Sequence, residues 1–424
     1  MTDFYIRPGT SHSVSRDGRS YATAWGPGED VGLGANDVLY LCGTFPTTFQ
    51  IKWNGNVSGH FQYRGDAPEE AGQIIVTSGA CLTGATTKDY VQYIGLVFST
   101  STTSDAVTLD TGSSFNDFID CTFQNCGGRA LRFKTTGECH VRGCSFLNNF
   151  GFGVYAANSP DLIIENCYFE NNGGISTNDD SIGIDDGCIN AIVRDCVVVG
   201  SNSIDGSGID IQDSSLSGGK IQVLRCSVTG SEGTNYSATG GVGGPDVVFE
   251  GCQSSTGRIG YFVKGKNDVF IYNCNESDST LNGIKAGGTT VDTGEIQLVV
   301  SNCIFETAGG ATTIWYVDNG ASSSLSINNS CYAGTPLFTR YETATNESFA
   351  AWQGAGYDAD SVNSDPLLDG NLSPQDGSPC LGVGVKWWGN DARPSGYDGE
   401  PMPDTKIDVG SIQTTLDPGH PANL

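Results

Sequence analysis

Two short segments each place an aspartate directly after an apolar residue of an expected strand. They read SIGIDDG (residues 181–187) and GSGIDIQ (residues 206–212), and aligning them pairs Asp185 with Asp210. Two carboxyl groups held close together can break a glycosidic bond, because one protonates the leaving oxygen while the other attacks the sugar or activates water. The alignment therefore predicts Asp185 and Asp210 as a catalytic acid pair.

More acidic residues crowd the same part of the sequence, with Asp180, Asp186 and Asp213 within a few residues of the predicted pair. Carboxylates packed this closely do not all ionise cheaply, so one of them keeps its proton to higher pH or a cation binds. We therefore count Asp180 and Asp186 as catalytic candidates and Asp213 as a substrate-binding one. No cofactor is required, Ca²⁺ is an alternative, and no metal ligands can be assigned. A solvated acidic loop is an equally good interpretation.

The predicted pair belongs to a longer series of outward positions. A segment of the form Gly/Ala-apolar-x-apolar recurs along the chain, and its middle residue must point away from the core. These middle residues are Arg132, Tyr155, Asp185, Asp210, Gly243, Phe262, Lys285 and Trp315. Aromatic rings beside hydrogen-bonding groups suit sugars, and one group per level suits a polymer. The column predicts a polysaccharide groove with Tyr155, Phe262, Trp315 and Lys264 in contact with substrate; an ordinary decorated surface is the alternative.

A lyase mechanism is the second chemical reading of the same column. There Ca²⁺ would neutralise a uronate, and Lys285, Arg132 or Tyr155 would serve as base or acid. All four histidines lie outside the column, which disfavours a histidine mechanism. We place hydrolysis slightly ahead because the two aspartates are central and the basic residues lie several levels away.

A cysteine repeat supplies the elements that position these residues. Its members are Cys121, Cys144, Cys167, Cys196, Cys226, Cys252, Cys274, Cys303 and Cys331, with Leu96 in the same slot one unit earlier. A loosely held period of this kind marks a solenoid whose units stack. Apolar residues five and three before each cysteine follow period two and predict a strand. The residue just before the cysteine, such as Asn166 or Gly143, is of a type that tolerates left-handed backbone and supplies a bend.

The cysteines themselves are predicted to form a buried interior ladder. Stacked parallel side chains seldom meet the dihedral angle that a disulfide needs, so they are expected to be reduced. Six further cysteines lie off the ladder and cannot be paired from the sequence: Cys42, Cys81, Cys126, Cys139, Cys188 and Cys380.

Three short strands per unit and no helical period give an all-β fold class. The pattern resembles the right-handed parallel β-helix of pectate-lyase-like, polysaccharide-active proteins and phage tailspikes or depolymerases, over residues 90–332. The resemblance implies a solenoid of about ten or more rungs with N- and C-terminal caps. The expected organisation is a cap and first rungs over 1–89, a central β-helix over 90–333, and last rungs and a cap over 334–424. The Gly-His-Gly and Arg-Ile-Lys motifs of polygalacturonases and the Asp-Pro-His motif of alginate epimerases are absent.

Both ends carry expected caps. The segment from Phe4 to Gly26 resembles the opening of bacterial β-helix proteins, and residues 364–385 with 408–413 resemble their closing segment. A bare solenoid would expose apolar rungs and unpaired strand edges, so caps are physically required.

The charge and hydropathy of the sequence limit which partners and which location we expect. The formal net charge is -27, and phosphate binding needs Lys and Arg, so a nucleic-acid partner is disfavoured. The sequence has no long apolar run, so we expect no membrane insertion. Its first 17 residues show no export signal, so either a signal peptide was removed earlier or the protein is a virion component released by lysis; the expected location is extracellular or virion-associated. A homotrimer is implied by the tailspike resemblance alone. The function expected is an endo-acting glycan depolymerase, with a non-catalytic glycan-binding module or virion adhesin as the alternative and a purely structural solenoid as the third.

Overall fold

The computed structural model describes the chain in several stretches: residues 2–8, 19–20, 22, 24–26, 33–68, 70–83, 88–174, 178–213, 218–240, 244–265, 268–287, 296–306, 311–316, 324–340, 346–367, 375–376 and 378–380. Two compact units divide between Ile209 and Asp210, and each is described by itself. Strand β22 (Ser207–Asp213) contains this division.

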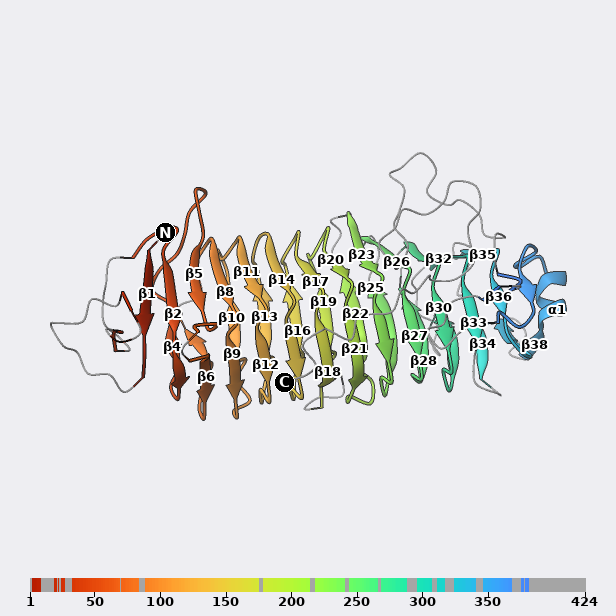
Figure 1. The fold of residues 1–424 in the computed structure, drawn as a ribbon. Helices are drawn as coiled ribbons and strands as arrows, with labels where there is room; N and C mark the ends of the chain where they lie inside the picture. The colour runs from red at the N-terminus through yellow and green to blue at the C-terminus, as the bar shows by residue number, and fades with distance from the viewer. Residues whose placement is uncertain are drawn as a thin grey trace. The chain divides into compact units, whose positions relative to one another are not determined.

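The first unit is built from three parallel sheets and a short strand pair (Figure 1). The first sheet contains, in spatial order, β1 (Asp3–Ile6), β2 (Val38–Leu41), β5 (Phe61–Arg64), β8 (Val91–Ile94), β11 (Asn116–Ile119), β14 (Cys139–Arg142), β17 (Ile163–Glu165) and β20 (Ile192–Arg194). The second contains β3 (Gly43–Phe45), β6 (Gly72–Val76), β9 (Val97–Thr100), β12 (Thr122–Gln124), β15 (Ser145–Leu147), β18 (Tyr168–Asn172) and β21 (Val197–Ser201). The third contains β10 (Val107–Leu109), β13 (Leu131–Lys134), β16 (Val154–Ala157) and β19 (Ile182–Asp185), and the pair is β4 (Phe49–Gln50) with β7 (Leu82–Thr83).

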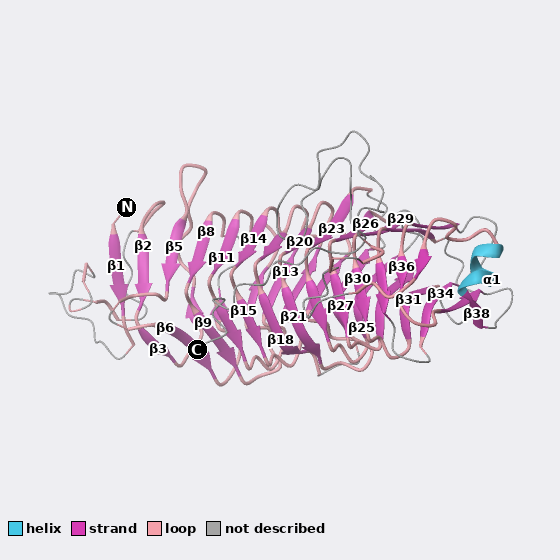
Figure 2. Cartoon of the chain, turned by 45° about the vertical axis from the view of Figure 1, so that its right-hand side comes forward, coloured by secondary structure: helices cyan, strands magenta, loops and turns pink. Residues whose placement is uncertain are grey.

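The second unit repeats the same three-sheet plan. Its first sheet contains β23 (Lys220–Leu224), β26 (Asp246–Glu250), β29 (Asp268–Tyr272), β32 (Gln297–Ser301) and β35 (Ser324–Asn328). The second contains β24 (Ser227–Thr229), β27 (Gln253–Ser255), β30 (Asn275–Ser277), β33 (Ile304–Glu306), β36 (Cys331–Tyr332) and β39 (Val362–Asn363). The third contains β25 (Thr234–Gly240), β28 (Ile259–Lys264), β31 (Asn282–Ala286), β34 (Thr312–Tyr316), β37 (Leu337–Arg340) and β38 (Asn346–Ser348). In the described part the helix α1 (Phe349–Gly354) stands alone among strands (Figure 2). The predicted all-β solenoid is confirmed.

The solenoid interior is filled as the repeat predicts. Phe123, Phe146 and Phe169 stack with ring centroids 4.8 and 4.6 Å apart on successive strands of the second sheet. All fifteen cysteines are buried thiols and not disulfides. The Cys167 thiol donates to the carbonyl oxygen of Val141 on the preceding rung, at 3.6 Å. The ladder is therefore a column of small apolar side chains with weak thiol hydrogen bonds.

The predicted bend before each ladder cysteine is confirmed in the backbone. Asn166 has φ of 54° and Asn273 of 51°, both in the left-handed region. Arg225, which lacks a side chain suited to that region, adopts it as well with φ of 51°. At the last expected position the left-handed residue is Asn329, and Cys331 pairs with Ile304 and not with Cys303, so Cys331 lies one residue beyond the ladder slot and its place in the ladder was wrong. Carbonyl and amide pairing along the stack imposes the bend even where the residue type does not favour it.

A Cys167→Ser variant is expected to lose about 1–3 kcal/mol of unfolding free energy, because a hydroxyl costs more to bury than a thiol. Its nearest partners are the carbonyl oxygens of Val141 and Glu165. Denaturant unfolding measures the loss, and thiol titration should find the cysteines unreactive until the chain unfolds. Unfolding at the parental midpoint would contradict the ladder.

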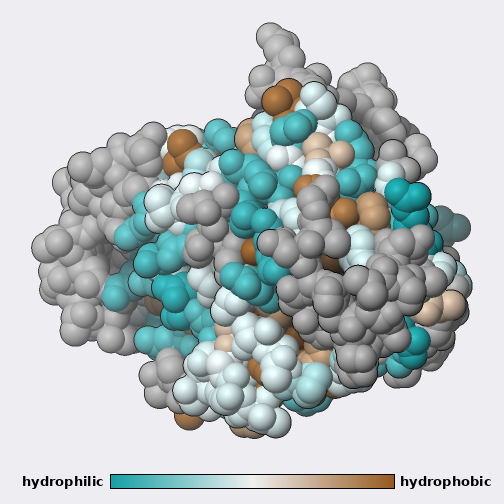
Figure 3. Space-filling model, turned by 90° about the vertical axis from the view of Figure 1, so that its left-hand side faces the viewer, coloured by the Kyte–Doolittle hydropathy of each residue, from teal (hydrophilic) through white to brown (hydrophobic). Residues whose placement is uncertain are grey.

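The two ends of the chain differ in how much the structure describes. At the N-terminal end β1 pairs in parallel with β2, as expected of an entry strand, and Trp25 stacks on Phe4 at 5.1 Å. The residues on this end that are not grey in Figure 3 are largely teal or white, with apolar ones in small separate patches. The expected closing segment falls mostly on residues outside the described stretches.

Helix α1 covers one part of the second unit. Ser348 caps it, accepting a hydrogen bond from the Ala351 amide, and its buried Trp352 stacks on Phe338 at 4.9 Å and on Tyr357 at 4.6 Å. The helix thus shields apolar side chains of the third sheet, which is what a cap must do. No helix in the described part is both long and apolar enough to cross a membrane.

Candidate functional site

The predicted site residues belong to the third sheet, and the register of its strands sets their levels. In the first unit Arg132 pairs with Tyr155, as expected. Tyr155 pairs with Gly183, however, and not with Asp185. The expected level of Asp185 was therefore wrong by two residues. Inward and outward side chains alternate along a strand, so shifting a strand by two residues leaves this pattern unchanged. The pattern therefore predicts which face a side chain lies on, but not which residue of the neighbouring strand it pairs with.

Two arginines and an aspartate form the first part of this surface. The Arg132 guanidinium donates to the Asp105 carboxylate, Nη1 to Oδ2, at 3.1 Å. Arg129 lies 3.8 Å from the same carboxylate and stacks over Tyr155, with its guanidinium carbon 4.5 Å from the ring centroid. A planar guanidinium on an aromatic face fixes the ring in place. Tyr155 is therefore held between cationic groups on one side and its own strand on the other.

Tyr155 and Asp185 are joined directly in spite of the shifted register. The Tyr155 hydroxyl donates to Asp185 Oδ2 at 2.8 Å, and the backbone N–H of Asp186 donates to Oδ1 at 2.8 Å. Burial, and next the hydrogen bond to Asp185, raise the pKa of Tyr155 to about 12. The phenol therefore stays protonated at neutral pH and acts as a donor that orients the carboxylate.

The two neighbouring acids have different environments. Asp180 is buried, 5 % exposed, and its Oδ1 accepts a hydrogen bond from the backbone N–H of Ser207. This contact ties one rung to the next, and the catalytic role of Asp180 stays a prediction. Asp186 is exposed beside Asp185. Its side chain therefore remains accessible to a ligand at this surface.

Asp210 and Asp213 lie on β22 in the second unit. Asp210 is partly exposed before the buried Ile211, so it points outward as expected. The side chain of Asp213 lies outside the described residues. The pairing of Asp185 with Asp210 stays a prediction.

The second unit presents an aromatic–lysine–aromatic stack on the outer face of its third sheet. Phe262, Lys285 and Trp315 occupy the same level of successive strands, as expected. The Lys285 ammonium lies 5.4 Å from the Phe262 centroid and 5.2 Å from the Trp315 centroid. Burial lowers the pKa of Lys285, and the nearby charges of Arg258 and Lys264 add to the effect. The lysine thus loses its proton more readily than an exposed one.

A second expected member of the column, after Asp185, is also wrong. The strand register pairs Phe262 with Ser237, and the expected Gly243 lies outside the described residues. Lys264 ends β28 and is partly exposed, next to the stack. It therefore remains placed to contact a ligand bound on Phe262.

Arg129, Asp105 and Arg258 are charged residues near this face that sequence reasoning missed. They lie in the turns before or between strands, and the repeat was used to select strand residues alone. An arginine directly before the apolar pair, as in GGRALRF, was the available signal. In the described part of the chain no group of three or more His, Cys, Asp or Glu side chains has a metal-binding arrangement.

Comparison with known proteins agrees with this architecture. Residues 78–217 match a family model described as a right handed beta helix region. No curated protein matches the chain. Among solved structures, XylC in complex with xylose has a TM-score of 0.67 at 10% identity, covering 97% of this chain and 98% of that one.

Two further structures have the same fold. Pectate lyase Pel9A has a TM-score of 0.53 at 12% identity, covering 97% of this chain and 96% of that one. The N-terminal fragment of bacteriophage Phi29 gene product 12 has a TM-score of 0.51 at 10% identity, covering 74% and 68%. At sequence identities of 10–12%, these matches support a shared fold and nothing further. With the matched family model and the parallel sheets of both units, they show that the chain folds as a right-handed parallel β-helix.

Proposed function

We propose that this protein binds a polysaccharide along the outer face of its third sheet and cleaves it internally. The observation that carries the proposal is the side-chain chemistry of that face: aromatic rings and charged hydrogen-bonding groups occupy neighbouring strands in both units, as in Phe262–Lys285–Trp315. Rings stack on the C–H faces of sugars while charged groups bind hydroxyls or carboxylates. Pectate lyase Pel9A and a xylose complex of XylC are among the proteins that share the fold.

Hydrolysis is the preferred chemistry, with Asp185 as the principal carboxylate. Asp185 is oriented by the Tyr155 hydroxyl at 2.8 Å and by a backbone N–H. Asp210 is its proposed partner, and Asp186 is the exposed acid beside it. Together they would supply the acid and the nucleophile or base of glycoside hydrolysis.

The lyase alternative now depends on Lys285. Tyr155, with a pKa of about 12, is no base at neutral pH, and Arg132 is paired with Asp105. The lowered pKa of Lys285 suits a base. Ca²⁺ binding belongs to this alternative.

A glycan-binding module without catalysis is the second candidate, because the Phe262–Lys285–Trp315 stack needs no chemistry to hold a sugar. A virion adhesin would fit this role, and a bacteriophage protein is among those that share the fold. An extracellular or virion-associated location follows from either function, and a homotrimer is part of the phage alternative.

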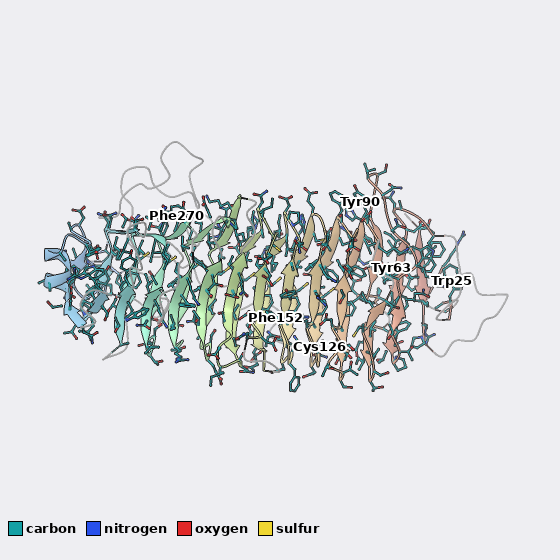
Figure 4. The ribbon with its side chains drawn as sticks, turned by 180° about the vertical axis from the view of Figure 1, so that it is seen from behind. Trp25, Tyr63, Tyr90, Cys126, Phe152 and Phe270 are labelled. Carbon is teal, nitrogen blue, oxygen red and sulfur yellow. The ribbon has the colours of Figure 1, made fainter. Side chains whose placement is uncertain are left out.

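A Trp315→Ala variant is expected to lose about tenfold in glycan affinity, or about 1.4 kcal/mol, while the fold stays intact, because the side chain lies on the outer face. Affinity electrophoresis or calorimetry measures the loss. Phe270→Ala is the matched control, since Phe270 is also a partly exposed aromatic of the second unit but lies on its first sheet (Figure 4). Equal losses in both variants, or unfolding of Trp315→Ala, would contradict the proposed surface.

A further inference from the structure

Two aromatic residues of the first unit occupy a backbone conformation that aromatic residues rarely adopt. Tyr90 and Phe115 each have φ of 57° and lie just before strands β8 and β11. The register of the first sheet runs Gln92, Asp117, His140, Ile163, Ile192 across successive strands. Counting two residues back from this register places Tyr90 and Phe115 in one column with Glu138, Asp161 and Asn190. All of these except Glu138 have left-handed backbone.

Asp161 and Asn190 show which residue types adopt the left-handed region at this position without strain. Both are left-handed too, with φ of 57° and 60°. Short polar side chains tolerate this region, whereas a bulky residue there is a genuine outlier. Backbone strain of this kind persists only where the surrounding structure holds it in place, and it clusters at ligand sites. Tyr90 and Phe115 thus occupy a position at which Asp161 and Asn190 adopt the same backbone conformation without strain.

Core packing does not account for these rings. The Tyr90 and Phe115 rings stack on each other, with centroids 4.6 Å apart and an interplanar angle of 11°. Phe115 is 37% exposed, and Tyr90 is partly exposed. Figure 4 shows Tyr90 near the upper edge of the stacked strands and Phe152 well below it. The stack therefore lies at an edge of the first sheet, and its apolar surface is open to a ligand.

A ladder of hydrogen-bonding side chains runs beside the stack. Gln62 donates to Gln92, and Gln92 donates to Asp117 Oδ2, both at 2.9 Å. His60 Nε2 and His140 Nδ1 lie 3.9 and 3.8 Å from the two Asp117 oxygens. The His60 ring also meets Tyr90 edge-on, with centroids 5.8 Å apart. One polar group per strand thus follows the rings at a spacing of about 4.8 Å.

We propose that Tyr90, Phe115, His60, Asp117 and His140 form a second saccharide site, on the first sheet and separate from the outer face of the third. Rings beside a repeating row of amide, carboxylate and imidazole groups match the apolar faces and hydroxyls of a sugar chain. Asp117, together with Asp89 and Glu138 nearby, makes this surface acidic, so it selects neutral over anionic saccharides. The inference shares with the proposed function the idea of a glycan ligand but uses none of its residues.

The test replaces each ring by the residue type that the repeat itself uses. Tyr90→Asn and Phe115→Asn are expected to keep or raise the melting temperature, because asparagine relieves the strain, while binding of a neutral oligosaccharide falls about tenfold or more. The probes are xylohexaose, cellohexaose and mannohexaose, with the hexamer of galacturonic acid as the anionic comparison. The full-length protein, labelled with ¹⁵N-histidine, is titrated with each, and the His60 and His140 signals are assigned with single His→Asn variants.

The His60 and His140 signals of the parent should shift with at least one neutral probe, and less or not at all with the anionic one. These shifts should persist in Trp315→Ala and disappear in Phe115→Asn. Unmoved histidine signals, undiminished binding in both Asn variants, or unfolding of both would overturn the second site. Histidine shifts that vanish in Trp315→Ala would also overturn it, by assigning the sugar to the third sheet. Shifts without any effect of Trp315→Ala on glycan affinity would instead contradict the proposed function and leave the second site standing.

Discussion

An Asp185→Asn variant is expected to lose turnover by about 100-fold or more while it still binds glycan. The change preserves shape and removes the charge and the exchangeable proton that acid–base or nucleophilic catalysis needs. The asparagine oxygen can still accept the hydrogen bond that the Tyr155 hydroxyl now donates to Asp185 at 2.8 Å. Binding and fold should therefore survive, and kcat rather than KM should change.

The Asp110→Asn variant is the matched control, because it also removes one carboxylate from the first unit. Asp110 directly follows β10 in the first unit, two strands from Tyr155 on β16, and its carboxylate lies 3.9 Å from the Lys134 ammonium. Asp110→Asn is expected to keep parental turnover. If Asp185→Asn and Asp210→Asn both cleave at the parental rate, the acid-pair mechanism is wrong and the Lys285 lyase alternative replaces it.

Glu276→Gln is expected to stabilise the protein at pH 8 by about 1–3 kcal/mol and to change it little at pH 5. Glu276 occupies an inward position of β30, paired with Ser254 on one side and Phe305 on the other. It is 1% exposed; Oε1 accepts from the Ser279 backbone N–H at 3.1 Å, and Oε2 is buried without a partner. Burial raises the pKa of Glu276 from 4.5 to about 7.

The direction of the pH dependence follows from that raised pKa. In the unfolded chain the carboxyl ionises near pH 4.5, while in the folded chain it keeps its proton until about pH 7. Its contribution to stability is therefore fully present below about pH 4.5 and is lost as the pH rises through 7. Glu250, with a pKa raised by burial to about 7, and Asp358, raised by burial to about 6, act in the same direction. The parent should thus unfold more easily at pH 8 than at pH 5.

Denaturant unfolding of both proteins at pH 5 and pH 8 checks this expectation. Glu232→Gln is the control, since Glu232 is an exposed residue of the second unit and its replacement should leave the parental pH dependence in place. A Glu276→Gln variant with the same loss of stability between pH 5 and pH 8 as the parent would show that the buried carboxyl is not its source.

The sequence predicted the interior of the solenoid well and the levels of its surface residues less well. The cysteine ladder and the bend at Asn166 follow from residue type and period, and both are confirmed. The level of Asp185 was missed because loops of varying length separate the rungs. An alignment on Ile184 satisfies the inward pattern as well as one on Ile182 does, and backbone pairing alone selects Ile182 opposite Val154.

Whether a site residue could be predicted depended on its lying in a strand or in a turn. Lys285 between Phe262 and Trp315 was predictable because all three are strand residues at equivalent positions. Arg129 was missed because its guanidinium reaches Tyr155 from a turn, and turns carry no period. The left-handed backbone at Phe115 is invisible to residue-type reasoning, since a phenylalanine argues against that conformation.

The most direct test of the central claim is to incubate the parent with a panel of neutral and acidic polysaccharides and measure two products in parallel. Reducing-sugar release reports hydrolysis or elimination, and ultraviolet absorbance of an unsaturated product reports elimination alone. We predict release of reducing ends from at least one polysaccharide, without ultraviolet absorbance, and its loss in Asp185→Asn. Absence of cleavage across the whole panel, with glycan binding retained, would contradict the enzymatic claim and leave a binding module.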